Sequence, residues 1–75
     1  MIYQELHQLF QTGVRVSNRE LKTILQSLYN KYNVDATATA TDIKKYGFTT
    51  KPCKINQNGT ILNGLILTEI WTHNS

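Results

Sequence analysis

The chain of 75 residues is short of several residue types, and each shortage excludes a class of protein. Its single cysteine, Cys53, cannot form an internal disulfide, so we expect a protein of the reducing cytoplasm. No apolar run comes near the length of a membrane span. His7 and His73 are isolated, the acidic residues are scattered, and there is no glycine-rich phosphate loop. We therefore expect no enzyme, no metal site and no cofactor.

Length and composition predict one small globular domain over residues 1–75. The hydrophobic fraction is 40% and the charged fraction 17%, which is typical of a folded chain rather than a disordered one. A chain of this size buries only about 60% of its unfolded surface, so its core is too small for a deep catalytic cleft.

Basic residues are unevenly distributed along the chain. Up to Asp42, four basic residues balance four acidic ones, whereas the rest of the chain sets four lysines against Glu69 alone. These lysines are Lys44, Lys45, Lys51 and Lys54. The C-terminal half should therefore attract polyanions, unless the lysines only keep an exposed face soluble.

Apolar spacing predicts two helices in the first half of the chain. The first covers Ile2–Gln11, and Val14–Val16 follows as a short strand or extended connection. Ser17 and Glu20 have the spacing of a capping box, which starts a second helix that runs to about Tyr32. An apolar stripe marks its buried side, formed by Leu21, Ile24, Leu25, Leu28 and Tyr32. Asn33 suits the C-terminal cap.

The segment Val34–Gly47 fits two structures. Alternating alanine and threonine over residues 36–41 is compatible with a strand, but large apolar residues are missing. We favour a short helix from Thr37 or Thr39 to Tyr46, ended by Gly47, because threonine and Asp42 suit a helix start. As an α-helix it would have Ala36, Ala40, Ile43 and Gly47 on one face.

Two strands and a tight turn complete the chain. Phe48–Ile55 and Thr60–Trp71 flank an Asn-Gly turn of two or four residues. Pro52 indicates an edge strand or a bulge, and Gly64 a bend. The order helix, strand, helix, helix, strand, turn, strand predicts an α+β fold, a winged helix-turn-helix with three helices and a C-terminal β-hairpin wing.

This fold predicts binding to double-stranded DNA. The third helix would enter the major groove, and the hairpin would contact phosphates or the minor groove. The candidate DNA-binding residues are Arg19, Thr37, Thr39, Thr41, Lys44, Lys45, Lys51, Lys54, Asn56, Gln57 and Asn58, and Arg15 is a further candidate to clamp the DNA backbone. Since neither the third helix nor the hairpin holds an arginine, we expect A·T-rich contacts or weak sequence preference.

Several stretches resemble a known family. They are Ser17–Asn33, Ala40–Phe48, Lys51–Lys54 and Asn58–Thr60 ahead of Gly64, and together they look like the small C-terminal winged-helix domain of poxvirus-type primase-helicases. These are replication proteins of phages, plasmids and staphylococcal mobile elements. The resemblance implies that the four lysines contact duplex DNA at a replication origin, with a replicative helicase or other replication protein as a further partner.

The last strand supports an alternative. Leu62, Leu65, Ile66 and Leu67 are more apolar than a strand with one wet face requires. A protein-interaction winged helix, such as a small phage factor that docks on a host or helicase protein, would explain them. A small dimeric transcriptional regulator is a third possibility. Lysines gathered on one face would favour DNA, and lysines scattered around an apolar patch would favour a protein partner.

Overall fold

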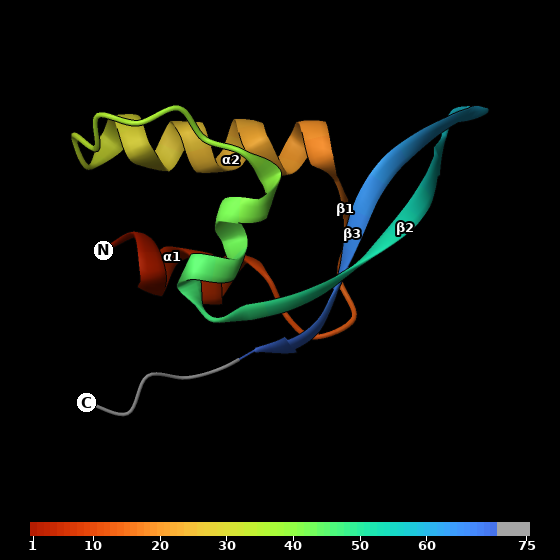
Figure 1. Cartoon of the computed structure of the whole chain (residues 1–75), viewed down its shortest axis with the longest axis horizontal. Helices are drawn as coiled ribbons and strands as arrows, with labels where there is room; N and C mark the ends of the chain where they lie inside the picture. Colours follow the sequence, from red (N-terminus) through yellow and green to blue (C-terminus); the bar gives the residue numbers. More distant parts are fainter. Residues whose placement is uncertain (71–75) are drawn as a thin grey trace.

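The computed structural model describes residues 1–70, which form an α+β fold of three helices and one antiparallel sheet. The elements are α1 (Ile2–Leu9), β1 (Arg15–Ser17), α2 (Asn18–Lys31), the 3-10 helix η1 (Ala40–Tyr46), β2 (Phe48–Gln57) and β3 (Thr60–Ile70). Their order is the predicted one, and Figure 1 shows the three helices at one end with the hairpin projecting from the other. The predicted strand end at Trp71 lies outside the described residues.

Helix α2 begins and ends close to the predicted bounds, but its predicted stripe is corrected at one position: Tyr32 is exposed, and Tyr29 is buried instead. The Ser17 hydroxyl accepts a hydrogen bond from the Glu20 backbone N–H at 3.1 Å, which satisfies one of the free donors of the first turn. At the other end Asn33 has φ 58°, and the Val34 N–H donates to the Tyr29 carbonyl at 2.8 Å. This is a Schellman ending, which uses the tolerance of asparagine for the left-handed region.

The structure corrects the prediction for residues 34–46. Ala36 and Thr37 lie in an irregular segment, so neither a strand nor a helix from Thr37 is present. Helix η1 begins at Ala40 with Thr39 as its N-cap, and the left-handed Gly47 ends it at φ 92°. The start at Thr39 and the stop at Gly47 are therefore confirmed.

The 3-10 geometry of η1 changes which side chains share a face. With three residues per turn, positions three apart line up along the helix. Ala40, Ile43 and Tyr46 form such a row, and all three pack in or against the core. The predicted α-helical face with Ala36 and Gly47 is wrong for this reason.

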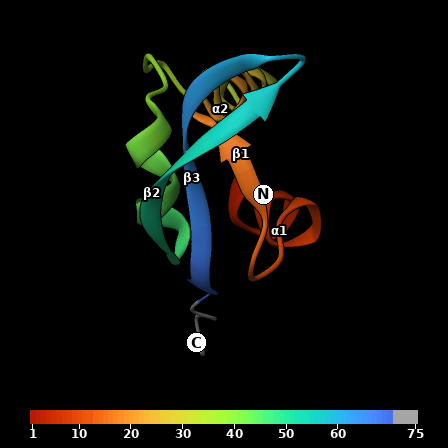
Figure 2. The same cartoon turned by 90° about the vertical axis from the view of Figure 1, so that its right-hand side faces the viewer.

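The sheet has the strand order β1-β3-β2, all antiparallel, so β3 lies in the middle. The hairpin turn has two residues, because Gln57 pairs with Thr60. Asn58 and Gly59 have φ of 55° and 83°, as a turn that follows the right-handed twist of the strands requires. Figure 2 shows this hairpin twisting as it passes in front of α2.

Three irregularities shape the hairpin. Pro52 lies on the edge strand β2, as predicted, but the bulge is elsewhere, between Thr49 and Thr50. Gly64 leaves room for a neighbour, since a Cβ there would lie 2.4 Å from Ile55 Cδ1. The Ile55 side chain therefore lies over Gly64. The glycine thus has a packing role, which the predicted bend did not include.

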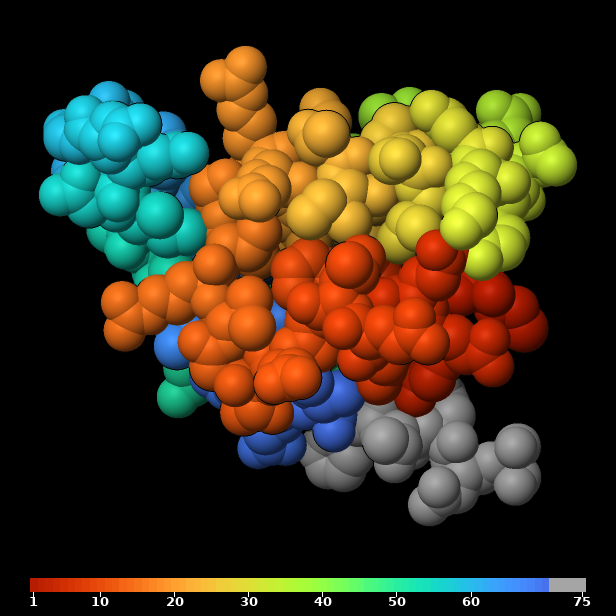
Figure 3. Space-filling view, turned by 180° about the vertical axis from the view of Figure 1, so that it is seen from behind, coloured from red at the N-terminus to blue at the C-terminus, as the bar shows by residue number. Residues whose placement is uncertain are grey.

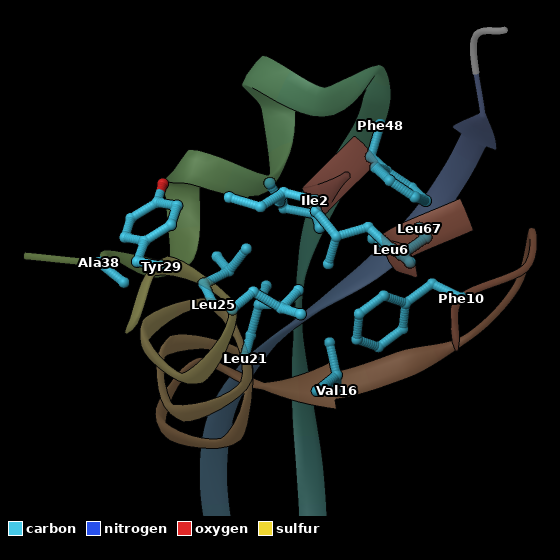
Figure 4. Close-up of a cluster of buried hydrophobic side chains, with 12 residues drawn as sticks. Ile2, Leu6, Phe10, Val16, Leu21, Leu25, Tyr29, Ala38, Phe48 and Leu67 are labelled. Carbon is cyan, nitrogen blue, oxygen red and sulfur yellow. The ribbon is translucent and has the colours of Figure 1, made fainter. Parts of the chain in front are cut away.

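The core lies between the helices and one face of the sheet. Figure 4 shows side chains from both α-helices meeting Phe48 and Leu67 of the hairpin. His7 packs between the rings of Tyr3 and Phe48, and its Nε2 lies 2.9 Å from the Tyr46 carbonyl oxygen. His7 is therefore a helix-packing residue that ties α1 to the end of η1.

Candidate nucleic-acid interface

A surface groove lies where α2 and η1 begin. It is lined by Asn18, Arg19, Lys22, Thr37, Ala38, Thr39 and Ala40, and is called the α2–η1 groove below. Arg19 and Lys22 are three residues apart on α2, so they extend from adjacent turns of one helix face. Two cations and two threonine hydroxyls thus border one concave surface, and three of the predicted DNA-binding residues are among them.

Gln26 holds the irregular segment against α2. Its Nε2 donates to the Ala36 carbonyl at 3.2 Å, and its Oε1 accepts from the Ala38 N–H at 2.9 Å. Ala38 is fully buried beside it. One side-chain amide thereby satisfies two backbone groups in a segment without regular structure, and this positions Thr37 and Thr39 at the groove.

A carboxylate fixes the start of η1. Asp42 accepts hydrogen bonds from the Thr39 N–H at 3.1 Å, the Thr39 hydroxyl at 2.9 Å and the Tyr29 hydroxyl at 3.0 Å. The Thr39 backbone bond is the main cause that lowers the pKa of Asp42 below its ordinary value. Burial, followed by hydrogen bonds with Tyr46 and Asp42, raises the pKa of Tyr29, which therefore stays a hydrogen-bond donor.

The η1 lysines stand away from the groove. At a rise of about 2 Å per residue, Lys44 and Lys45 lie roughly 10 Å along the helix from its start. Lys45 Nζ is 3.5 Å from Asp42 Oδ1, so an acidic group partly neutralises it. Lys44 shares a 3-10 row with Thr41, and both are exposed. The solvent side of η1 therefore presents Thr41 and Lys44, and Lys44 forms no salt bridge with any of residues 1–70.

The hairpin contributes a second hollow next to the groove. This wing hollow is lined by Asn18, Pro52, Cys53, Lys54, Asn63, Gly64 and Leu65, and it adjoins the groove at their common residue Asn18. Lys54 Nζ donates to Asn63 Oδ1 across the hairpin, so its position is constrained. Asn56 caps the turn by accepting from the Gly59 N–H at 3.1 Å, and its oxygen is therefore already engaged.

The strand register separates lysines that the sequence groups together. Lys51 and Lys54 are three residues apart on β2 with no bulge between them, so they extend from opposite faces of the strand. Lys51 pairs with Ile66, which also pairs with Arg15 on the other side. Lys51 and Arg15 thus belong to the sheet face opposite Lys54, so the lysines do not share the single face that would have favoured DNA over a protein partner.

The remaining predicted residues lie at the hairpin tip. Asn58 occupies the first turn position, and Gln57 borders a third hollow, between the hairpin and the first turns of α2. Three residues of the interface were not predicted. Lys22 could have been found from its spacing to Arg19, whereas Asn18 and Asn63 required the fold and the hairpin register.

Comparison with protein-family models, with curated proteins and with solved structures gives no match to this chain. Within residues 1–70, no three His, Cys, Asp or Glu side chains lie close enough together to hold a metal ion. None of the helices in this part of the chain combines the length and apolarity of a membrane span.

Proposed function

We propose that this chain is a DNA-binding domain of the winged helix-turn-helix class that binds duplex DNA. The observation that carries the proposal is the α2–η1 groove, where Arg19 and Lys22 border one concave surface together with the side chain of Thr37. The wing hollow continues this surface and adds the ammonium of Lys54. Cations and hydroxyls around a concave surface are the groups that contact phosphates.

Each element has a distinct part in this proposal. The start of α2 contacts the DNA backbone, η1 presents Thr41 and Lys44 to a groove of the duplex, and Lys54 contacts phosphate from the hairpin. Threonine can touch a thymine methyl or donate to an oxygen, but lysine carries little sequence information. The expected binding is therefore mostly electrostatic, with weak sequence preference.

The sequence resemblance supports a narrower version of the proposal. The stretches named in the sequence analysis resemble the winged-helix domain of primase-helicases from phages and mobile elements, so a replication origin is the duplex to test first. The same resemblance supports a tethered or associated replicative helicase as a partner. Neither point is needed for the duplex-binding proposal itself.

Fluorescence anisotropy of labelled duplex DNA, measured over a salt series, tests whether the α2–η1 groove contacts phosphates. Replacing Arg19 and Lys22 by glutamine removes two phosphate contacts. The negative slope of log K for duplex binding against log salt should therefore become shallower by about 1.8. The matched control is the pair Arg15→Gln and Lys51→Gln, which removes the same charge from the opposite sheet face. This control should leave the slope unchanged.

Two further results bear on the proposal. In a Lys44→Ala and Lys45→Ala variant, the salt slope of duplex binding should change by less than the loss of two full phosphate contacts would give, because Asp42 already neutralises Lys45 in part. If both glutamine pairs weaken duplex binding equally, net charge rather than the groove is responsible. If the unaltered protein binds no duplex at low salt, the proposal is wrong.

A further inference from the structure

One face of the sheet carries cations beside an apolar strip. Arg15, Ile66 and Lys51 lie side by side across β1, β3 and β2, because Ile66 pairs with both basic residues. Alternation along the strands puts Ile55 and Leu62, a directly opposed pair, on the same face. This cationic strip is defined by these five residues.

The cationic strip lies outside the core. Val16, Leu65 and Leu67 point to the other face, where the helices cover them. The three apolar residues of the strip are half-buried and belong neither to the core nor to the side chains packed against it. Within residues 1–70, Arg15 and Lys51 form no salt bridge. Figure 3 shows the hairpin at one end of the molecule, beside the first residues of α2.

A hollow adjoins the strip at Leu62. It lies between the hairpin and the first turns of α2, and its lining includes the apolar residues Ile24 and Leu62 and the polar residues Arg19, Glu20 and Gln57. Such a hollow can receive one apolar side chain from a ligand that lies along the strip. An anchored apolar side chain next to charged groups is the usual anatomy of a protein-protein contact.

We propose that the cationic strip binds an acidic amphipathic segment of another protein, whose carboxylates pair with Arg15 and Lys51. Charge complementarity selects this occupant, since Ile66 lies directly between the two cations and Ile55 and Leu62 extend the apolar surface on the same face. Glu69, which pairs with Thr49 farther along the sheet, leaves the face with a net positive charge. A second copy of the chain would bring like charges together.

Two other modes of binding fit the strip less well. Duplex DNA would cover the apolar residues with polar, charged groups and leave them without apolar partners. A strand added to the edge of β2 would meet Pro52, which has no N–H to donate. The partner therefore lies across the face of the sheet.

The test is a ¹H-¹⁵N NMR titration with a synthetic amphipathic peptide of leucine and glutamate. The amide signals of the strip should shift, and those of Thr37 and Thr39 in the α2–η1 groove should not. The control peptide has lysine in place of glutamate and should cause no shift. Arg15→Glu with Lys51→Glu should weaken binding of the acidic peptide about tenfold or more, a loss of about 1.4 kcal/mol or more.

A second charge reversal controls for folding and net charge. Lys22→Glu with Lys44→Glu makes the same change away from both the strip and the hollow beside Leu62, and should retain peptide binding while losing duplex binding. The proposal is overturned if the acidic peptide shifts no strip signal, if the lysine peptide binds as well, or if both reversed variants bind the acidic peptide equally. Because the two double variants affect different ligands, failure here is distinguishable from failure of the DNA proposal.

Discussion

A single methyl group at Gly64 should destabilise the whole domain. A Cβ at this position would lie 2.4 Å from Ile55 Cδ1 and 2.6 Å from the Val16 carbonyl oxygen. Ordinary contacts between non-bonded heavy atoms are about 3.5–4 Å, so both neighbours must move by roughly 1 Å. The Ile55 side chain can rotate, but the Val16 carbonyl belongs to β1, which is held in the sheet by β3.

The expected cost of Gly64→Ala follows from this overlap. Inserting a methyl into a packed site costs about 1–3 kcal/mol. A domain of this size has a free energy of unfolding of roughly 4–11 kcal/mol, and each lost kcal/mol lowers Tm by about 4–8 °C. Differential scanning calorimetry should therefore show Tm lowered by roughly 5–20 °C.

A double variant separates the two overlaps. Ile55→Ala removes the side-chain contact but leaves the backbone contact with Val16, so the pair Gly64→Ala and Ile55→Ala should recover only part of the loss. A Tm that falls by less than about 3 °C in the single variant would refute the reasoning, since it corresponds to under about 0.5 kcal/mol. Full recovery in the double variant would show that the backbone contact is not limiting.

Three further predictions concern the supports of the groove. The pKa of Asp42 is lowered from 3.8, so its stabilising effect is complete above this pH and is lost as pH falls through the lowered pKa; Asp42→Asn should flatten this acid-induced loss in a circular dichroism titration. Gln26→Ala frees the backbone of the irregular segment, so the Ala38 amide should exchange with deuterium faster while the centre of α2 stays protected. Ser17→Ala removes the N-cap of α2 and should cost about 1 kcal/mol in urea unfolding, whereas Ser17→Asp should restore most of it. Unchanged acid unfolding, exchange or urea stability, respectively, would contradict each of them.

Much of the fold could be predicted because its signals are local. The Ser17 cap and the apolar stripe define α2, and Asn58-Gly59 defines a turn, since positive φ is accessible to these two residues without a partner. Gly47 stops η1 for the same reason. These elements follow from conformational preferences within a few residues of sequence.

The form of η1 required the tertiary structure. Its sequence allows either an α-helix or a 3-10 helix, and the two differ in the residues that share a face. In the fold, Ala40, Ile43 and Tyr46 pack together on the core, which a period of three achieves. Packing against α2 and the sheet therefore selects the row of Ala40, Ile43 and Tyr46 as the buried side of η1. The same choice leaves Lys44 exposed.

The candidate site also depended on non-local structure. Lys51 and Lys54 look equivalent in the sequence, but three residues of regular strand put them on opposite faces, and the pairing register decides that Lys51 shares its face with Arg15 and Ile66. The α2–η1 groove joins Arg19 and Thr39 only because α2 and η1 pack across each other. The sequence by itself determined α1, α2, the two hairpin strands and the position of their turn. Tertiary packing determined the form of η1 and which charges lie together, because faces and distances depend on how the elements contact one another.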